Sequence, residues 1–232
     1  MADTGSQPVK ILTDDGKAYW AKEPRNPHGN ESLLAEVICH EVAKYLQLPV
    51  PQYALVELPR NLKIHSYESP DDLTCFGSEL ITGTVESRDL KHLSDDDNSV
   101  HAPRFIALWE WCDGNDEQFL YQTLSEHSLV SFDFGMWLGI EAQWSVSSYT
   151  SKPPPHSRWP GSVKGMSTRS FIDAANLVGN LTQKQALQIV SAVPVEWGFT
   201  DRDLIEVARF LMDRATRVKA SLQAHSANAK QP

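Results

Sequence analysis

The spacing of hydrophobic and polar residues predicts a β-hairpin followed by a helix at the start of the chain. Two short alternating segments, 9–13 and 18–22, flank an Asp-Gly turn, which is typical of a hairpin. From about Glu31 to Leu46, apolar residues recur at helical spacing. The prolines of "LPVP" end this helix, because proline lacks a backbone N–H and constrains the residue before it.

Strand patterns continue beyond this helix. The segment 52–58 predicts a strand, and the segment 75–85 predicts a second strand that is broken at Gly77. The acidic stretch "SDDDNSV" (94–100) then predicts a solvated loop. This loop is expected to separate a smaller N-terminal part of the chain from a larger C-terminal part.

The C-terminal part is predicted to be mostly helical around one further hairpin. A helix is expected over 102–112, and the segments "QFLYQTL" and "SLVSFDF" are expected to pair as strands. The Ser- and Pro-rich segment 145–162 is expected to be irregular. Three helices complete the chain: one over 169–179, one opened by the Thr182–Gln185 capping box, and one opened by the Thr200–Asp203 capping box.

This order of elements predicts an α+β protein with two lobes. We expect a small, mixed, β-rich N-lobe over residues 1–85 and a mostly helical C-lobe over residues 86–225 that contains the second hairpin. Residues 226–232 are expected to form a disordered tail. A ligand is most naturally placed between two such lobes.

Composition narrows the class of protein. The 232 residues include 41% hydrophobic residues and seven Trp, which is enough for a sizeable core. The net charge of −9, without a cluster of Lys and Arg, argues against direct binding of nucleic acid. No apolar run approaches the roughly 20 residues of a membrane span. Met1–Lys10 also lacks the apolar core of a signal peptide, so no membrane association is expected.

Cysteine and histidine usage predicts a compartment and argues against one kind of site. Cys39, Cys75 and Cys112 are an odd number of cysteines in apolar settings, which predicts buried free thiols in a cytoplasmic protein. The eight histidines are scattered without ligand-like spacing, and neither C-x-x-C nor H-E-x-x-H occurs. The sequence therefore predicts no zinc site.

Polar residues at both open ends of the second hairpin indicate a metal-phosphate site. Asp113 is followed five residues later by Gln118, where the first strand begins, and Asp133-Phe134-Gly135 ends the second strand. Because the two open ends of a hairpin are neighbours, we expect the carboxylates of Asp113 and Asp133 to lie side by side. Phosphoryl transfer needs one carboxylate near the attacking hydroxyl, and another carboxylate, usually with an amide, on Mg²⁺.

An upstream lysine and glutamate complete the order of groups that protein kinases use. Lys22 ends a predicted strand, and Glu36 lies on the helix that follows, so the chain reads Lys, Glu, Asp, Gln, Asp. The sequence leaves two assignments open: the acid that pairs with Lys22 and the acid that lies near the acceptor. On a helical wheel Glu41, rather than Glu36, falls within the apolar arc, so either acid could face Lys22. Asp116 competes with Asp113 for the position near the acceptor.

Several motifs carry a resemblance to a known family. The segment "LLAEVICHEVAKYLQLPVP" contains Glu36 at a set distance before Pro51, and "YWAK", "CDGNDEQFLY", "VSFDFG" and "VPVEWG" occur in the same order as the family's motifs. Over about residues 9–222 the sequence resembles the small HipA-like kinase family, which are distant relatives of the protein kinases. The resemblance implies a two-lobed, protein-kinase-like fold with ATP and Mg²⁺ as cofactors.

The resemblance implies catalytic and metal-binding roles for three residues. Asp113 would orient or deprotonate the acceptor hydroxyl. Asp133 would hold the Mg²⁺ that bridges the ATP phosphates. Gln118 stands where the family has Asn, and its amide oxygen, which is one methylene further out, would be the second metal ligand.

The resemblance also implies how the nucleotide is held. Lys22 would contact the phosphates and would itself be held by Glu36. The connection "SELITG", with Glu79 and Leu80, would lie near the adenine. No G-x-G-x-x-G loop precedes Lys22, so the segment 24–30 would cover the phosphates instead.

Taken together, these features predict an ATP- and Mg²⁺-dependent kinase that transfers phosphate to a protein Ser or Thr. The Ser-rich segment after Asp133 would be an activation segment or, more simply, a solvated loop. The resemblance also implies an antitoxin or other regulatory protein as a binding partner, as in a toxin–antitoxin pair. Two alternatives stay open. One is a kinase-shaped interaction protein with little or no transfer activity, which Gln118 and the missing Gly-rich loop motivate. The other is a phosphotransferase that acts on a small molecule or a lipid head group.

Overall fold

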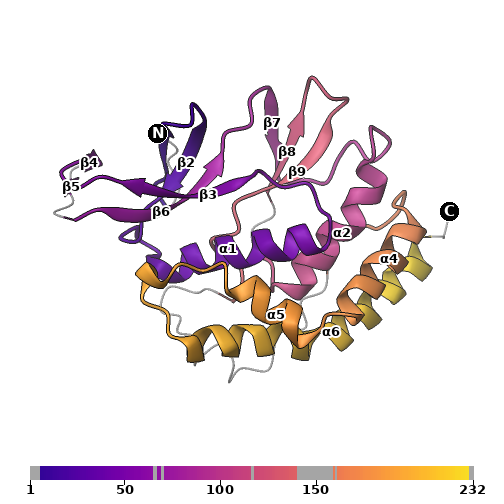
Figure 1. Ribbon diagram of the computed structural model, residues 1–232. Coiled ribbons are helices and arrows are strands. Elements are labelled where there is room, and N and C mark those ends of the chain that lie inside the picture. The colour runs from indigo at the N-terminus through magenta and orange to yellow at the C-terminus, as the bar shows by residue number, and fades with distance from the viewer. Residues whose placement is uncertain are drawn as a thin grey trace.

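The computed structural model of the chain has sheets in its N-terminal part and mostly helices in its C-terminal part (Figure 1). The α+β class expected from the sequence is confirmed. Among the residues that the structure describes, none of the helices combines the length and apolar character that crossing a membrane requires. The described residues are 6–64, 67–68, 71–115, 118–139, 159 and 161–229.

The main N-terminal sheet has four antiparallel strands in the order β1-β2-β6-β3. The predicted hairpin is present, since β1 and β2 pair directly and Gly16 in the turn between them has a φ of 79°. A short two-stranded ribbon lies beside this sheet. The strands are β1 (Val9–Leu12), β2 (Ala18–Lys22), β3 (Tyr53–Leu58) and β6 (Leu73–Glu79), with β4 (Lys63–Ile64) and β5 (Tyr67–Glu68) in the ribbon.

The predicted strand break at Gly77 is wrong. Strand β6 runs through Gly77 to Glu79 and pairs with both β2 and β3. A Cβ added at Gly77 would lie 2.7 Å from Cγ2 of Val56 and 3.4 Å from Cβ of Tyr19. The glycine therefore allows close packing inside the sheet, and the chain leaves the sheet only after Glu79, on its way to β7 (Thr84–Ser87).

Helix α1 (Gly29–Tyr45) lies beneath the main sheet, between the sheet and the helical part of the molecule (Figure 1). It contacts β6 on one side, and α2 (Asn98–Trp111) and α5 (Gln183–Val190) on the other. Nearly all of its middle is buried, including Glu36, which is only 1% exposed. A helix that is buried on several sides has no single apolar arc, and for this reason the helical wheel placed Glu36 wrongly.

Helix α2 (Asn98–Trp111) begins within the stretch predicted to be a loop. It continues through Pro103, which cannot donate the usual backbone hydrogen bond to the carbonyl of Ser99. That carbonyl instead accepts a 2.8 Å hydrogen bond from the backbone N–H of Ser167. The proline thus leaves an acceptor free that ties α2 to the start of α4 (Thr168–Gly179).

The second predicted hairpin forms a separate three-stranded antiparallel sheet in the order β7-β8-β9. Strand β8 (Phe119–Gln122) follows the end of α2, and β9 (Ser128–Ser131) leads to Asp133. Residue 85, where the N-lobe was predicted to end, lies inside β7, and β7 pairs with β8. The connection from the main sheet therefore joins the sheet of the hairpin directly.

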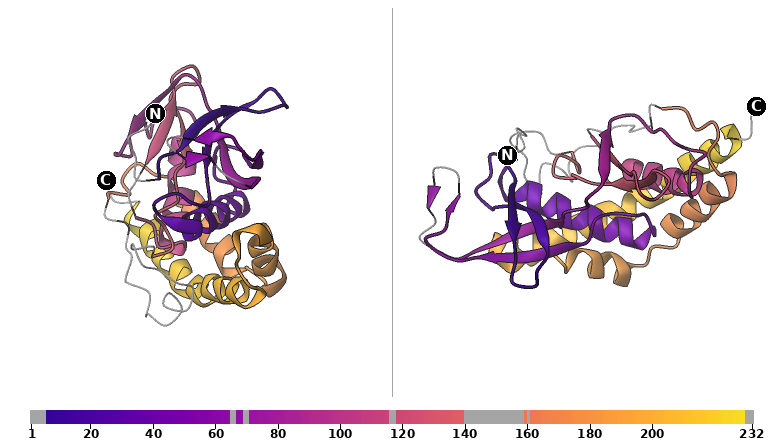
Figure 2. Two further views of the ribbon diagram at one scale, coloured as in Figure 1. Left: turned by 90° about the vertical axis from the view of Figure 1, so that its left-hand side faces the viewer. Right: turned by 90° about the horizontal axis from the view of Figure 1, so that it is seen from above.

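The C-terminal helices pack together at the base of the molecule (Figure 2). Both predicted capping boxes are present, at the starts of α5 (Gln183–Val190) and α6 (Asp201–Asn228). The predicted disordered tail is wrong for residues 226–228, because α6 continues to Asn228 and buries Ser226. The last three residues, 230–232, lie outside the described part of the chain.

A short 3₁₀ turn, η1 (Val195–Trp197), joins the helical part to the main sheet. The indole N–H of Trp197 donates a 2.8 Å hydrogen bond to the carbonyl of Thr74 on β6. The carbonyl of Trp197 accepts a 2.9 Å hydrogen bond from the side chain of Asn30 at the start of α1. These contacts hold β6, which pairs with the Lys22 strand β2, and helix α1, which carries Glu36, against the C-terminal part.

Candidate functional site

Lys22 joins three elements that are distant in sequence. It is the last residue of β2 and is 6% exposed. Its Nζ donates to Oε1 of Glu36 on α1 at 2.5 Å and to Oδ1 of Asp133, just after β9, at 2.6 Å. Three of the residues selected from the sequence therefore form one cluster, which we call the lysine cluster.

The second oxygen of Glu36 extends the lysine cluster to the Asp-Phe-Gly segment. Glu36 Oε2 accepts a 3.1 Å hydrogen bond from the backbone N–H of Phe134. At Gly135, an added Cβ would lie 3.2 Å from Glu36 Oε1 and 3.5 Å from Lys22 Nζ. Glycine thus keeps this side of the cluster clear.

The choice between Glu36 and Glu41 is settled by these contacts. Glu41 points away from Lys22: its Oε1 accepts a 2.7 Å hydrogen bond from Lys44 and another of 2.7 Å from the hydroxyl of Tyr53. Glu36 is the carboxylate that faces Lys22. The alternative that the helical wheel favoured is wrong.

The lysine cluster carries one more negative than positive charge when its groups are ionised. Burial by itself would lower the pKa of Lys22, but the Glu36 and Asp133 carboxylates outweigh it and raise that pKa above its usual value. Burial also works to raise the pKa of Asp133, but the Lys22 ammonium outweighs it and holds that pKa below its usual range. Burial raises the pKa of Glu36, which Lys22 offsets only in part. The excess negative charge is therefore suited to a cation.

Asp113 lies in the turn after α2 and contacts a residue that the sequence did not single out. Its Oδ1 is 3.5 Å from the Nη2 of Arg214 on α6, and the same nitrogen donates a 2.6 Å hydrogen bond to the carbonyl of Glu110. Burial raises the pKa of Asp113, and Arg214 works against that rise. The backbone of Asp113 is in the left-handed region, with φ 52°. Its side chain is thus held by α6.

The loops that carry Asp113 and Asp133 are neighbours, whereas the hairpin argument predicted that the two carboxylates themselves lie side by side. The N–H of Leu138, beyond the Asp-Phe-Gly segment, donates a 2.7 Å hydrogen bond to the carbonyl of Cys112. Phe119 and Ser131 are paired residues at the open end of the hairpin. This register brings Gln118, which precedes Phe119, to the same end of the hairpin as Asp133. The carboxylate of Asp113 itself contacts Arg214.

Glu79 and Leu80 lie where the main sheet connects to the hairpin sheet. The N–H of Leu80 donates a 2.8 Å hydrogen bond to the carbonyl of Ala18, and the N–H of Glu79 donates one of 2.8 Å to the carbonyl of Gln52. The carboxylate of Glu79 forms a 2.8 Å ion pair with Lys17 in the β1–β2 turn. The connection is therefore tied to that turn.

The segment 24–30 is folded against the start of α1. Asn26 is buried, and its side chain donates to the carbonyls of Glu23 and Gly29 and accepts from the N–H of His28. Asn26 also accepts a hydrogen bond from Ser32 on α1. This segment is held by its own hydrogen bonds at the helix end nearest the lysine cluster.

The sequence analysis did not select two buried polar residues near the site, Arg214 and His40. Only Arg214 could have been found from the sequence pattern. Arg214 falls on the buried stripe of α6 between Leu211 and Val218, and a charged residue in such a stripe is unusual. His40 lies one turn after Glu36 and is completely buried. Its Nδ1–H donates a 2.7 Å hydrogen bond to the carbonyl of Glu36, and its ring lies 5.0 Å from that of Phe134.

His40 is expected to make stability fall in mild acid. Burial lowers the pKa of His40 from 6.5 to about 4, so the unfolded chain takes up a proton at a higher pH than the folded protein does. Between about pH 7.5 and pH 5 this difference should remove about 2 kcal/mol of unfolding free energy. His40→Leu should lose about 2 kcal/mol less over that range, as measured by urea unfolding. Equal losses in both proteins would contradict the prediction.

Other expectations fall partly or wholly outside the described residues. Asp116, the competitor of Asp113, lies outside them, and so does most of the segment 145–162. The three cysteines are described, and all are buried and free, as predicted.

Comparison with known proteins adds independent findings. A family model described as HipA-like kinase matches residues 1–99, which include Lys22, Glu36 and the whole main sheet. None of the curated proteins matches the chain. Among solved structures, the chain is similar to the proinflammatory kinase CtkA of Helicobacter pylori, with a TM-score of 0.50 and 10% sequence identity. That likeness covers 100% of this chain and 95% of the other, and it confirms the predicted two-lobed, kinase-like fold.

Proposed function

We propose that this chain, which is HipA-like over residues 1–99 and kinase-like in fold, is an ATP- and Mg²⁺-dependent phosphotransferase that acts from the lysine cluster. Both comparisons support a kinase-type function. The observation that carries the proposal is the pair of contacts of Lys22, at 2.5 Å to Glu36 and 2.6 Å to Asp133. A lysine held by a helix glutamate beside the Asp-Phe-Gly aspartate is the arrangement that phosphate-binding kinases use.

The chemistry of the lysine cluster fits the proposed cofactors. The side chain of Asp133 is 25% exposed, so it has an oxygen to offer to solvent, whereas that of Glu36 is 1% exposed. A carboxylate together with an amide oxygen, which Gln118 at the same end of the hairpin would supply, is the hard-oxygen donor set that Mg²⁺ prefers. When bound, Mg²⁺-ATP would supply the phosphoryl group and neutralise charge that develops during its transfer.

Each of the selected residues would have a separate role in phosphoryl transfer. Lys22 would bind the nucleotide phosphates through Nζ, and Glu36 would keep that Nζ in place. Asp133 and Gln118 would hold the metal ion. Asp113 would accept a hydrogen bond or a proton from the attacking hydroxyl, with Arg214 fixing its carboxylate.

The family resemblance supports a proposal for the position of the nucleotide base and for the acceptor. The connection at Glu79 and Leu80 would lie against the adenine. The acceptor would be a Ser or Thr of a protein, and a regulatory partner such as an antitoxin would act on the kinase. The three buried free thiols support a cytoplasmic location. A small molecule or a lipid as the acceptor is the alternative within the same reaction class.

A catalytically weak, kinase-shaped interaction protein is the second candidate function. The presence of Gln118 in the place of the expected Asn favours it, because the longer side chain positions its amide oxygen differently. Under this alternative Mg²⁺-ATP would bind without phosphate moving to an acceptor.

Binding of Mg²⁺-ATP tests the proposal directly. At about 100 times its dissociation constant, Mg²⁺-ATP should stabilise the wild-type protein by about 2.7 kcal/mol, which raises the melting temperature by about 5–10 °C. Asp133→Asn should lose most of this shift, because it removes the charged metal ligand. Asp173→Asn, an equal charge change on the exposed surface of α4, should keep it.

The shift produced by Mg²⁺-ATP, rather than the melting temperature itself, is the quantity to compare between variants. If the wild type shows no shift, the proposed function is wrong. An equal shift in wild type and Asp133→Asn would place nucleotide binding elsewhere.

A further inference from the structure

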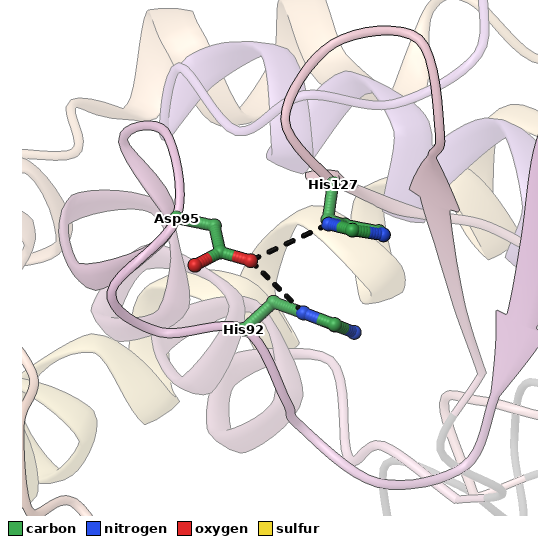
Figure 3. Close-up of side chains that lie close together, drawn as sticks. All are labelled: His92, Asp95 and His127. Atoms are coloured by element: carbon green, nitrogen blue, oxygen red, sulfur yellow. Dashed lines mark hydrogen bonds and ion pairs between the residues drawn. The ribbon is translucent and has the colours of Figure 1, made fainter.

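Two histidines and an aspartate meet at the closed turn of the β8–β9 hairpin, at the opposite end of β9 from Asp133. His92 and Asp95 lie in the loop that leads into α2, and His127 lies in the turn between β8 and β9 (Figure 3). Oδ2 of Asp95 is 3.0 Å from Nδ1 of His92 and 3.4 Å from Nδ1 of His127. We call these three residues the histidine cluster.

A buried asparagine holds the two loops of the histidine cluster in register. Asn98, the first residue of α2, is 0% exposed. Its Nδ2 donates 2.9 Å hydrogen bonds to the carbonyls of both His92 and His127. Its Oδ1 accepts a 2.7 Å hydrogen bond from the N–H of Leu129. One buried amide thus fixes the backbone of both histidines before any ligand binds.

The two imidazole rings pack against each other. The rings of His92 and His127 are stacked, with centroids 4.2 Å apart and an angle of 11° between their planes. The ring of Tyr121 makes an edge contact with that of His92, with centroids 5.0 Å apart and an angle of 62° between the planes. Both histidines have a left-handed backbone, with φ values of 53° and 59°, which is uncommon for a residue other than glycine.

We propose that the histidine cluster is a binding site for one divalent transition-metal ion of the Zn²⁺ class. In a tetrahedral zinc site with bonds of 2.0–2.1 Å, two donor atoms lie about 3.3 Å apart. The two distances from Asp95 to the histidine nitrogens, 3.0 and 3.4 Å, lie on either side of that value. Two imidazoles and one carboxylate suit zinc, nickel or copper better than magnesium.

Coordination changes the local geometry in a defined way. Each Nδ1 carries a proton and contacts Asp95 directly, or it loses the proton and offers its lone pair to the metal. Because the rings are nearly parallel, they must rotate out of the stack so that both lone pairs converge on the ion. The partly exposed cluster leaves a fourth position for water or for another ligand.

The position of the histidine cluster gives the metal a structural consequence. Asp113 follows the C-terminal end of α2, whereas the cluster lies at the N-terminal end of that helix and at the closed turn of the hairpin. A bound ion would connect this turn to the loop before α2. It would thereby restrain α2, which leads to Asp113, and β9, which leads to Asp133. Metal binding by the histidine cluster does not require ATP at the lysine cluster, so it can be tested independently of the proposed function.

Metal binding by the purified full chain tests the proposal. After treatment with a chelator, the protein is titrated with Zn²⁺ against a chromophoric chelator and with Co²⁺ by visible absorption. We expect one equivalent to bind, with the Co²⁺ spectrum of a four-coordinate site. His92→Ala, Asp95→Ala and His127→Ala should each weaken Zn²⁺ binding by at least the roughly 10–100-fold that loss of a supporting contact costs.

His101→Ala is the matched control, because it removes a histidine of α2 that lies outside the cluster. It should keep the affinity of the wild type, and circular dichroism should show that all four variants are folded. Failure of the wild type to bind Zn²⁺ would overturn the proposal. So would cluster variants that bind as tightly as the wild type, or a His101→Ala variant that loses as much affinity as they do.

Discussion

Asp113→Asn is expected to lower the rate of phosphate transfer about 10²–10⁴-fold while Mg²⁺-ATP still binds. The carboxylate of Asp113 contacts Arg214 and lies beyond the lysine cluster, so its loss leaves Lys22 and Asp133 to hold the nucleotide. The measurement combines transfer of labelled γ-phosphate, to the protein itself and to a Ser/Thr peptide library, with the dissociation constant of Mg²⁺-ATP.

Asp213→Asn provides the control for this result. Asp213 is an exposed acid on α6, next to Arg214 in the sequence, and its replacement should leave transfer unchanged. Transfer by Asp113→Asn at the wild-type rate would show that another acid serves the acceptor, with Asp116 the first to test. If the wild type binds Mg²⁺-ATP but transfers phosphate to no acceptor, the interaction-protein alternative is favoured instead.

Lys22→Met is expected to have the second large effect, on both stability and transfer. It leaves the carboxylates of Glu36 and Asp133 without the cation that neutralises them, which should destabilise the fold by roughly 3–5 kcal/mol. Removing one positive charge from the phosphates should also lower transfer by about 10²–10³-fold. Urea unfolding and phosphate transfer measure the two effects.

A matched lysine and a double variant separate the two effects of Lys22→Met. Lys44→Met makes the same change at the partly exposed Lys44–Glu41 pair and should cost only about 0–1 kcal/mol. Adding Glu36→Gln to Lys22→Met removes one unpaired buried charge, and should restore part of the stability but none of the transfer. Recovery of transfer in the double variant would mean that Lys22 has only a structural role.

Local features of the fold could be predicted because their causes are local. The two capping boxes need only a Thr and an acceptor three residues later, and the first hairpin needs only alternating strands around an Asp-Gly turn. The predictions that failed concern long-range packing. Gly77 looked like a break, but it serves close contact with Val56 inside the sheet. The helix α6 extends into the predicted tail because Ser226 is buried there.

The sequence by itself determined the α+β class and the order Lys22, Glu36, Asp113, Asp133. Periodicity, turn residues and motif spacing depend only on residues that are close to one another in the sequence. Only the tertiary structure decided that Glu36 rather than Glu41 contacts Lys22. Helix α1 is buried on several sides, so the positions of its apolar residues do not show which face points toward Lys22. The same holds for Arg214 beside Asp113 and for the histidine cluster. Side chains from separate segments come together there through packing, and no local pattern records which loops will become neighbours.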